Sequence, residues 1–243
     1  MVPVPGTRYL AVFSILIYFS ASMLLVSLLL VTAFAADPQG PHSFVVAFIT
    51  DVQVPHPSSP SGTSPGVITL NITRHSAPRG SDRFWALLQD DFFDQAAFFR
   101  VVPNFIVQFG VAGDPRKTKK WDITIPDDPV LMSNDAGTIV YATAGPNTRT
   151  TQLFINYENN KNLDTQGFAP FGRVLSGMDV AAKIFNPTPG DSGGADQTTY
   201  TNRGNAWLKD VYPKANYILK AEVKGEDWNP SGDVGRKILR RRD

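Results

Sequence analysis

An arginine and a glutamine lie among apolar side chains in segment 98–110 of this 243-residue chain, FFRVVPNFIVQFG. Arg100 and Gln108 are an even number of positions apart, so an extended chain places both on one face. Pro103 cannot donate a ladder hydrogen bond, so we expect two strands rather than one. A guanidinium in this setting is suited to bind a carbonyl, a carboxylate or a phosphate. The alternative is a structural ion pair, for which the candidate carboxylates are Asp114, Asp127 and Asp128.

Two later segments also carry polar side chains in apolar surroundings. Segment 141–155, YATAGPNTRTTQLFI, joins small residues, a turn and a strand with Gln152 and Phe154 on one face. Segment 163–174 reads LDTQGFAPFGRV. In order, the three segments resemble the F-x-R-V-x-P-x-F-x-x-Q, A-G-P-N-T…Q-x-F-I and L-D…F-G-x-V motifs of the cyclophilin family of peptidyl-prolyl cis-trans isomerases. Core strands of an ordinary β-protein are the competing interpretation. They do not explain the polar residues, since an unpaired buried polar group costs about 1–3 kcal/mol.

The resemblance implies a role for each of these residues. Arg100 matches the catalytic arginine of the family and would hydrogen-bond the twisted prolyl amide or its neighbouring carbonyl, with Gln108 positioning it. The residues implied to bind substrate are Phe105, Ile106, Ala142, Thr143, Ala144, Gln152, Phe154, Leu163 and Phe168. Among them, the slot for the proline ring would be formed by Phe105, Ile106, Phe154 and Leu163, with Phe168 at its rim. The residue before proline would lie against Ala142, Thr143 and Ala144.

The composition agrees with a reaction that needs no reactive group. Rotation about an X-Pro bond breaks no covalent bond, and its barrier of about 18–20 kcal/mol comes from amide resonance. The chain has no cysteine, and its three histidines have no metal-ligand spacing, so neither a cofactor nor a metal is expected. It contains no G-x-S-x-G, Walker or Rossmann pattern. A net charge of +1 gives no reason to expect a nucleic-acid partner. We expect a monomeric domain whose substrates are proline-containing polypeptides.

The amino-terminal part predicts a secretory or membrane location. Residues 10–36 form 27 positions without a charge, long enough to span a bilayer. They read as an uncleaved signal anchor, with membrane attachment, or as a signal peptide cleaved near Ala35. Arg8 precedes the segment, and no lysine or arginine follows until Arg74. The positive-inside rule then places the domain on the non-cytoplasmic side, or makes it secreted or lumenal after cleavage.

The rest of the chain divides into four expected parts. They are a linker (37–41), the isomerase domain (42–225), a Pro/Ser-rich loop within it (53–66) and a basic, disordered tail (226–243). Helices are expected from Pro78, after Gly177 with a capping box at Ser176, and at 206–212, with a polar loop over 186–204. Asn71 lies in a glycosylation sequon on the outward face of a predicted strand.

The resemblance completes the expected fold and function. It implies a mainly β protein, a closed eight-stranded antiparallel barrel capped by two helices. The implied activity is prolyl cis-trans isomerisation that assists folding of secretory or membrane proteins. The alternative is a catalytically weak module that binds proline-containing segments. A third possibility is an anchored structural domain whose tail binds partners.

Overall fold

The computed structural model describes residues 37–228. The predicted signal anchor or signal peptide in segment 1–36, and nearly all of the basic tail, lie outside the described residues. Within residues 37–228, no helix combines the length and the hydropathy needed to cross a membrane.

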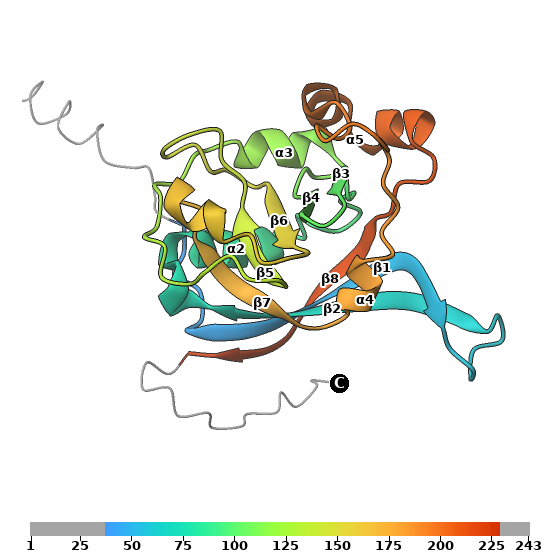
Figure 1. Cartoon of the computed structure of the whole chain (residues 1–243), viewed down its shortest axis with the longest axis horizontal. Helices are drawn as coiled ribbons and strands as arrows, with labels where there is room; N and C mark the ends of the chain where they lie inside the picture. Colours follow the sequence, from blue (N-terminus) through green and yellow to red (C-terminus); the bar gives the residue numbers. More distant parts are fainter. Residues whose placement is uncertain (1–36, 229–243) are drawn as a thin grey trace, which may run out of the picture. The chain divides into compact units, whose positions relative to one another are not determined.

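Eight antiparallel strands form one curled sheet in the described part of the chain (Figure 1). The strands are β1 (Ser43–Pro55), β2 (Thr63–Thr73), β3 (Arg100–Val102), β4 (Ile106–Phe109), β5 (Thr138–Tyr141), β6 (Leu153–Asn156), β7 (Pro170–Ser176) and β8 (Ile218–Asp227). Their order across the sheet is β3-β4-β6-β5-β7-β2-β1-β8. In β2, burial alternates along Ile68, Leu70 and Ile72, as the sequence predicts for a strand with one face in the core.

The predicted closed barrel is wrong, because β3 and β8 remain the two edges of this sheet. Between these edges, residues 37–228 contain a single isolated bridge, from Ala97 to Tyr217. Strand β3 has only three residues, and the chain before it turns at Gln95, whose φ is +62°. Backbone hydrogen bonds join residues 95–98 to residues 216–218, but no strand ladder forms there. The sheet is a curled half-barrel.

Helix α2 (Pro78–Gln89) packs on the sheet and starts at a proline, as the sequence predicts. Phe84 is fully buried and meets four other rings at centroid distances between 5.2 and 6.3 Å. These rings belong to Phe44, Phe48, Phe93 and Phe171. They lie at the centre of the main core, which fixes α2 against β1 and β7.

The segment that precedes β1 is also held on α2. Asp37 Oδ2 accepts a hydrogen bond from Arg83 Nε at 2.7 Å, and the Arg83 side chain is only 5% exposed. The N–H of Gly40 donates to Asp82 Oδ1 at 2.9 Å. Residues 37–41, the predicted linker, therefore contact the domain through an ion pair and a hydrogen bond.

The helices after β7 differ from the expectation. Helix α4 (Met178–Ala181) is a single turn, and its N-cap is Gly177 rather than the predicted capping box at Ser176. Gly177 has φ +94°, and a Cβ there would lie 2.2 Å from the carbonyl oxygen of Val67. The chain can pass β2 at this distance only with glycine at position 177. The turn leaves no extended N-cap for a serine to occupy.

Helix α5 (Gln197–Val211) begins inside the predicted loop 186–204, so that boundary is wrong. The predicted short helix at 206–212 is the last part of α5. Asp196 caps the helix by accepting from the N–H of Thr199 at 2.6 Å. A kink at Gly204, with φ +60°, divides the helix. Helix α3 (Pro115–Trp121), which packs beside α5, was not predicted.

The predicted loop 53–66 is partly strand. Strands β1 and β2 continue as a hairpin arm, with Gln53 paired to Pro65 and Pro55 paired to Thr63. Figure 1 shows this arm extending away from the rest of the sheet. The arm positions no residue of the pocket described below.

Candidate active site

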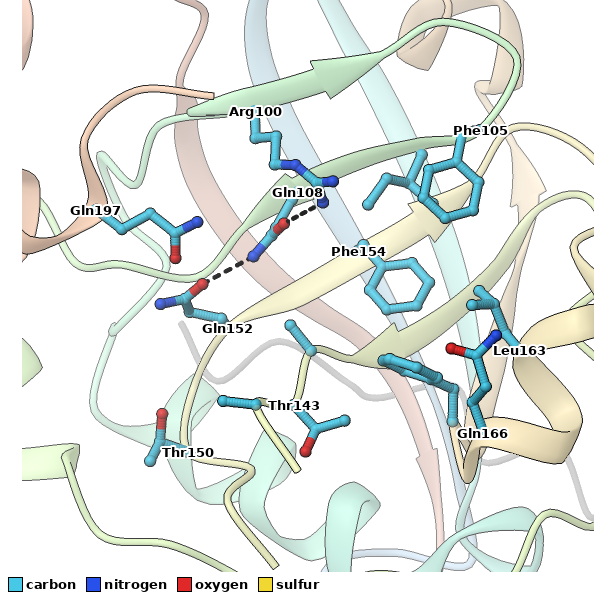
Figure 2. Close-up of a pocket in the computed structure, with 14 residues that line it drawn as sticks. Arg100, Phe105, Gln108, Thr143, Thr150, Gln152, Phe154, Leu163, Gln166 and Gln197 are labelled. Carbon is cyan, nitrogen blue, oxygen red and sulfur yellow. Dashed lines mark hydrogen bonds between the residues drawn. The ribbon is translucent and has the colours of Figure 1, made fainter. Parts of the chain in front are cut away.

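One pocket of about 450 Å³ brings together every residue that the sequence assigned a catalytic or substrate-binding role. Figure 2 shows its lining. The residues come from β3, β4, β6, the turn between β3 and β4, the segments that follow β5 and β6, and the start of α5. The lining is Arg100, Phe105, Ile106, Gln108, Ala142, Thr143, Ala144, Thr150, Gln152, Phe154, Leu163, Gln166, Phe168 and Gln197.

A row of three polar side chains crosses the floor of the pocket. Arg100 and Gln108 face each other across the β3–β4 ladder, and Gln108 faces Phe154 across the β4–β6 ladder. Arg100 Nη1 donates to Gln108 Oε1 at 2.8 Å, and Gln108 Nε2 donates to Gln152 Oε1 at 2.8 Å (Figure 2). A guanidinium only donates, so it fixes the orientation of both amides. The row leaves the Gln152 NH₂ group free of any partner within residues 37–228 and available to a ligand.

Arg100 is half-buried, and no carboxylate of the described chain lies within ion-pair distance of it. Its Nε donates to the carbonyl oxygen of Ser192 at 2.5 Å. Burial lowers the pKa of the Arg100 guanidinium, and the nearby carboxylate of Asp191 partly opposes this shift. The guanidinium remains charged at neutral pH, because arginine is not deprotonated in proteins.

The carboxylates considered as alternative partners of Arg100 are engaged elsewhere. Asp114 pairs with Arg116 at 2.8 Å. Asp127 and Asp128 lie 3.2 Å and 3.1 Å from nitrogens of Arg149. The structure therefore gives Arg100 no role in an ion pair with any of these three residues.

An apolar slot lies beside Arg100. Ile106, Phe154 and Leu163 are buried in one cluster with Val140, and partly buried Phe105 and Phe168 pack against it. The rings of Phe154 and Phe168 meet edge-on at 5.8 Å. The turn between β3 and β4 has Asn104 at φ +59° and directs Phe105 toward the slot. A proline ring is an apolar group of matching character, and the slot would remove it from water.

The outer wall of the slot is held by Asp164. Its carboxylate accepts from Ser133 Oγ at 2.6 Å and from the backbone and side-chain nitrogens of Asn134 at 2.8 and 2.7 Å. Burial raises the pKa of Asp164, but these hydrogen bonds outweigh it, and the net pKa lies below the usual value. Asn134 also donates to the carbonyl oxygen of Phe168 at 2.9 Å. This network fixes the positions of Leu163 and Phe168.

The opposite wall is the turn that contains Thr143 and Ala144. The hydroxyl of Thr148 accepts from the N–H of Ala144 at 2.9 Å and lies 2.9 Å from the hydroxyl of Thr143. The Thr143 hydroxyl also donates to the carbonyl oxygen of Gly145. These contacts occupy the Thr143 hydroxyl within the turn. The side chains of Ala142 and Ala144 are small, so a bound peptide can lie close to the backbone of the turn.

A buried ion pair between Arg149 and Asp128 stabilises this turn. Arg149 is 3% exposed and Asp128 is 4% exposed. Both terminal nitrogens of Arg149 lie 3.1 Å from Asp128 Oδ2, which also accepts from the N–H of Gly80 at 2.9 Å. Arg149 Nη2 donates in addition to the carbonyl oxygen of Pro126. The contacts join the 143–149 turn to the start of α2.

Three lining residues were missed by sequence reasoning. Thr150 is two positions before Gln152 and four before Phe154, so the same even spacing could have identified it. Gln166 lies within the third motif, between Leu163 and Phe168. Gln197 begins α5 and belongs to none of the motifs.

Asn71 lies outside the pocket. It is partly buried on β2, opposite Val45 of β1 and Arg173 of β7. Its glycosylation stays a prediction. Among residues 37–228, no three His, Asp or Glu side chains are grouped as metal ligands would be.

Three kinds of comparison place this chain and its fold among known proteins. Residues 61–203 match the family described as cyclophilin type peptidyl-prolyl cis-trans isomerase/CLD. A peptidyl-prolyl cis-trans isomerase of Acinetobacter baylyi is 33% identical over 130 residues, which is 51% of this chain and 69% of that protein. The isomerase ppi1 of Schizosaccharomyces pombe is 34% identical over 131 residues, which is 50% of this chain and 81% of that protein.

Solved structures support the same fold. A Cryptosporidium parvum cyclophilin type peptidyl-prolyl cis-trans isomerase matches with a TM-score of 0.54 and 19% identity, over 76% of this chain and 99% of its own. The same protein in the presence of the dipeptide Ala-Pro matches with a TM-score of 0.52. At this identity the structural likeness concerns the fold alone.

Proposed function

This chain belongs to the cyclophilin-type peptidyl-prolyl cis-trans isomerase family, and from that premise we propose that Arg100 catalyses rotation of X-Pro bonds by stabilising the twisted amide. The observation that carries the proposal is the position of a half-buried guanidinium, free of any ion pair within residues 37–228, at the edge of an apolar slot. Its fixed neighbours, Gln108 and Ser192, hold it in one orientation.

The reaction requires tighter binding of the twisted amide than of either planar isomer. Uncatalysed exchange takes tens to hundreds of seconds, so a turnover of roughly 10–10³ s⁻¹ requires a barrier lower by on the order of 4–7 kcal/mol. Twisting ends the amide resonance and gives the prolyl nitrogen a usable lone pair. Arg100 then donates to that lone pair or to the adjacent carbonyl, and a charged hydrogen bond contributes about 1.5–3 kcal/mol.

The remaining stabilisation comes from how the substrate is held. The slot around Phe154 fixes the proline ring, while the turn at Thr143 holds the residue before it, so rotation is confined to one bond. Because Arg100, Gln108 and Gln152 are already hydrogen-bonded in a row, little reorganisation is needed as the amide twists.

An exchange measurement on the purified full chain tests this function. We expect catalytic amounts to accelerate cis-trans exchange of a proline tetrapeptide, measured by NMR exchange spectroscopy. Peptide binding without any acceleration would contradict catalysis and leave the alternative, a module that only binds proline-containing segments.

Phe105→Ala is expected to weaken binding of the same peptide by about 5- to 30-fold, since the slot loses part of an aromatic contact, on the order of 1–2 kcal/mol. The dissociation constant is measured by calorimetry. Phe185→Ala is the matched control, because Phe185 is 42% exposed and lies outside the pocket. Equal affinity of wild type and Phe105→Ala would place the proline ring elsewhere.

The proposed setting is the secretory pathway, where slow prolyl exchange can limit protein folding. The supporting feature is the uncharged segment 10–36 after Arg8. Protease added to the cytoplasmic side of sealed membranes should leave the domain intact. Amino-terminal sequencing then distinguishes an uncleaved anchor from a product cut near Ala35. Digestion of the domain in intact vesicles would contradict this location.

A further inference from the structure

Residues 191–197, which we call the rim segment, lie beside Arg100 and end at Gln197, which lines the pocket. The rim segment contacts Arg100 at two points and the backbone of Phe99 at a third. The carbonyl oxygen of Ser192 accepts from Arg100 Nε at 2.5 Å, and the N–H of Ala195 donates to the carbonyl oxygen of Phe99 at 2.9 Å. Gly194 lies so close that a Cβ there would be 2.5 Å from Arg100 Cβ. The rim segment is therefore packed directly against the catalytic arginine.

Helix α5 holds the rim segment in place. Its cap, Asp196, accepts from the N–H of Thr199 at 2.6 Å. One turn into the helix, Tyr200 is fully buried, and its hydroxyl accepts from the N–H of Ala97 at 3.1 Å. The Tyr200 ring also meets the ring of Phe99 at 5.9 Å. The backbone of Gln197, the first residue of α5, is fixed by these contacts relative to β3.

The Gln197 side chain enters the pocket from this fixed position. It is partly buried, lines the pocket, and has no hydrogen-bond partner within residues 37–228. Figure 2 shows its amide on the side of the Arg100–Gln108–Gln152 row away from Phe105 and Leu163. The pocket thus has an apolar end, which is the proline slot, and a polar end that contains Gln197.

The polar end carries no charged side chain apart from Arg100. Its other polar groups are the Thr150 hydroxyl and the unpaired NH₂ of Gln152. A primary amide offers both a donor and an acceptor, as a peptide group does. A charged side chain placed there would lose hydration. The charges near it would be those of Arg100 and its neighbour Asp191, which have opposite signs. A main-chain amide is the ligand that this set of neutral groups matches best.

We propose that Gln197 binds a main-chain amide of the substrate outside the X-Pro unit, as the polypeptide leaves the slot past Arg100. This deepens the proposed function and rests on it, because the direction of the chain is defined by proline in the slot. Gln197 is then a substrate-binding residue that favours extended polypeptides over short proline peptides, whatever their side chains.

The test compares peptides of two lengths on the full chain. The probes are a capped Ala-Pro dipeptide and peptides that carry it with three alanines added before or after. We expect Gln197→Ala to weaken binding of one extended series by about 3- to 10-fold, the factor of one neutral hydrogen bond, with the dipeptide unchanged. Thr198→Ala is the control, because Thr198 is exposed in the same helical turn and does not line the pocket.

Two results would overturn the inference. One is an equal affinity of wild type and Gln197→Ala for all three peptides. The other is an equal loss for the dipeptide and the extended peptides, which would mean that Gln197 acts at the X-Pro unit. Neither result contradicts the proposed function, because wild type can still catalyse isomerisation. Failure of wild type to accelerate exchange would instead contradict the proposed function.

Discussion

Arg100→Ala is expected to lower kcat/KM for a proline peptide by on the order of 10²-fold while changing the peptide dissociation constant by less than about 3-fold. The reason is that the guanidinium gains its strongest hydrogen bond only when the amide is twisted, and loss of one such donor costs about 2.7–4 kcal/mol in transition-state stability. Coupled exchange kinetics give kcat/KM, and calorimetry gives the dissociation constant.

Two further variants make this prediction specific. Arg100→Lys keeps a positive charge but loses the planar fork that contacts Ser192 and Gln108 together, so we expect activity between those of wild type and Arg100→Ala. Arg173→Ala removes an exposed arginine of β7 outside the pocket and should leave kcat/KM unchanged. Equal activity of wild type and Arg100→Ala would contradict the role of Arg100 as the catalytic group.

Arg149→Met is expected to lower the free energy of unfolding by about 3–5 kcal/mol, because it leaves the buried carboxylate of Asp128 without its buried cationic partner. The Arg149 and Asp128 side chains are only 4% and 0% exposed. Backbone N–H groups of Arg79 and Gly80 also bind Asp128, at 3.1 and 2.9 Å, but they carry no charge. Urea unfolding followed by tryptophan fluorescence measures the change.

The matched control for this ion pair is Arg79→Met. The Arg79 side chain lies 4.0 Å from the same carboxylate but is 54% exposed. An exposed pair contributes about 0–1 kcal/mol, so the free energy of unfolding should change little. Similar losses in the two methionine variants would show that burial of Arg149 is not the cause of its effect.

The centre of the candidate site was predictable because its geometry is local. A turn at Pro103 and Asn104 brings Arg100 opposite Gln108 within one hairpin. Strand periodicity then places Gln152 and Phe154 on the same side as each other. The family resemblance joined these segments to Leu163 and Phe168, which no local pattern could have placed beside β4.

The parts that could not be predicted depend on contacts between distant residues. Gln197 reaches the pocket because Tyr200 docks on the backbone of Ala97, and nothing in the composition of segment 186–204 signals that contact. Four residues near the start of α5, at positions 198–201, are threonine or tyrosine, which are weak helix formers. Barrel closure likewise depends on how residues 95–98 meet residues 216–218, which lie far apart in the sequence.

The boundaries at the hairpin arm and at α4 were missed for a different reason. Serine and proline favour turns, yet the β1–β2 pairing extends to Pro55 and Thr63 at an edge where proline is tolerated. At α4 the sequence offered a capping box, but the close passage of Gly177 over Val67 determines the backbone instead. In both places tertiary contacts override local preference.

The most direct measurement of the central claim is the rate at which a bound proline peptide interconverts between its isomers on the enzyme, obtained by NMR exchange spectroscopy at saturating protein. If Arg100 stabilises the twisted amide, Arg100→Ala will lower this on-enzyme rate by on the order of 10²-fold with a nearly unchanged dissociation constant. An unchanged on-enzyme rate with weakened affinity would contradict the claim and make Arg100 a group that binds the planar substrate.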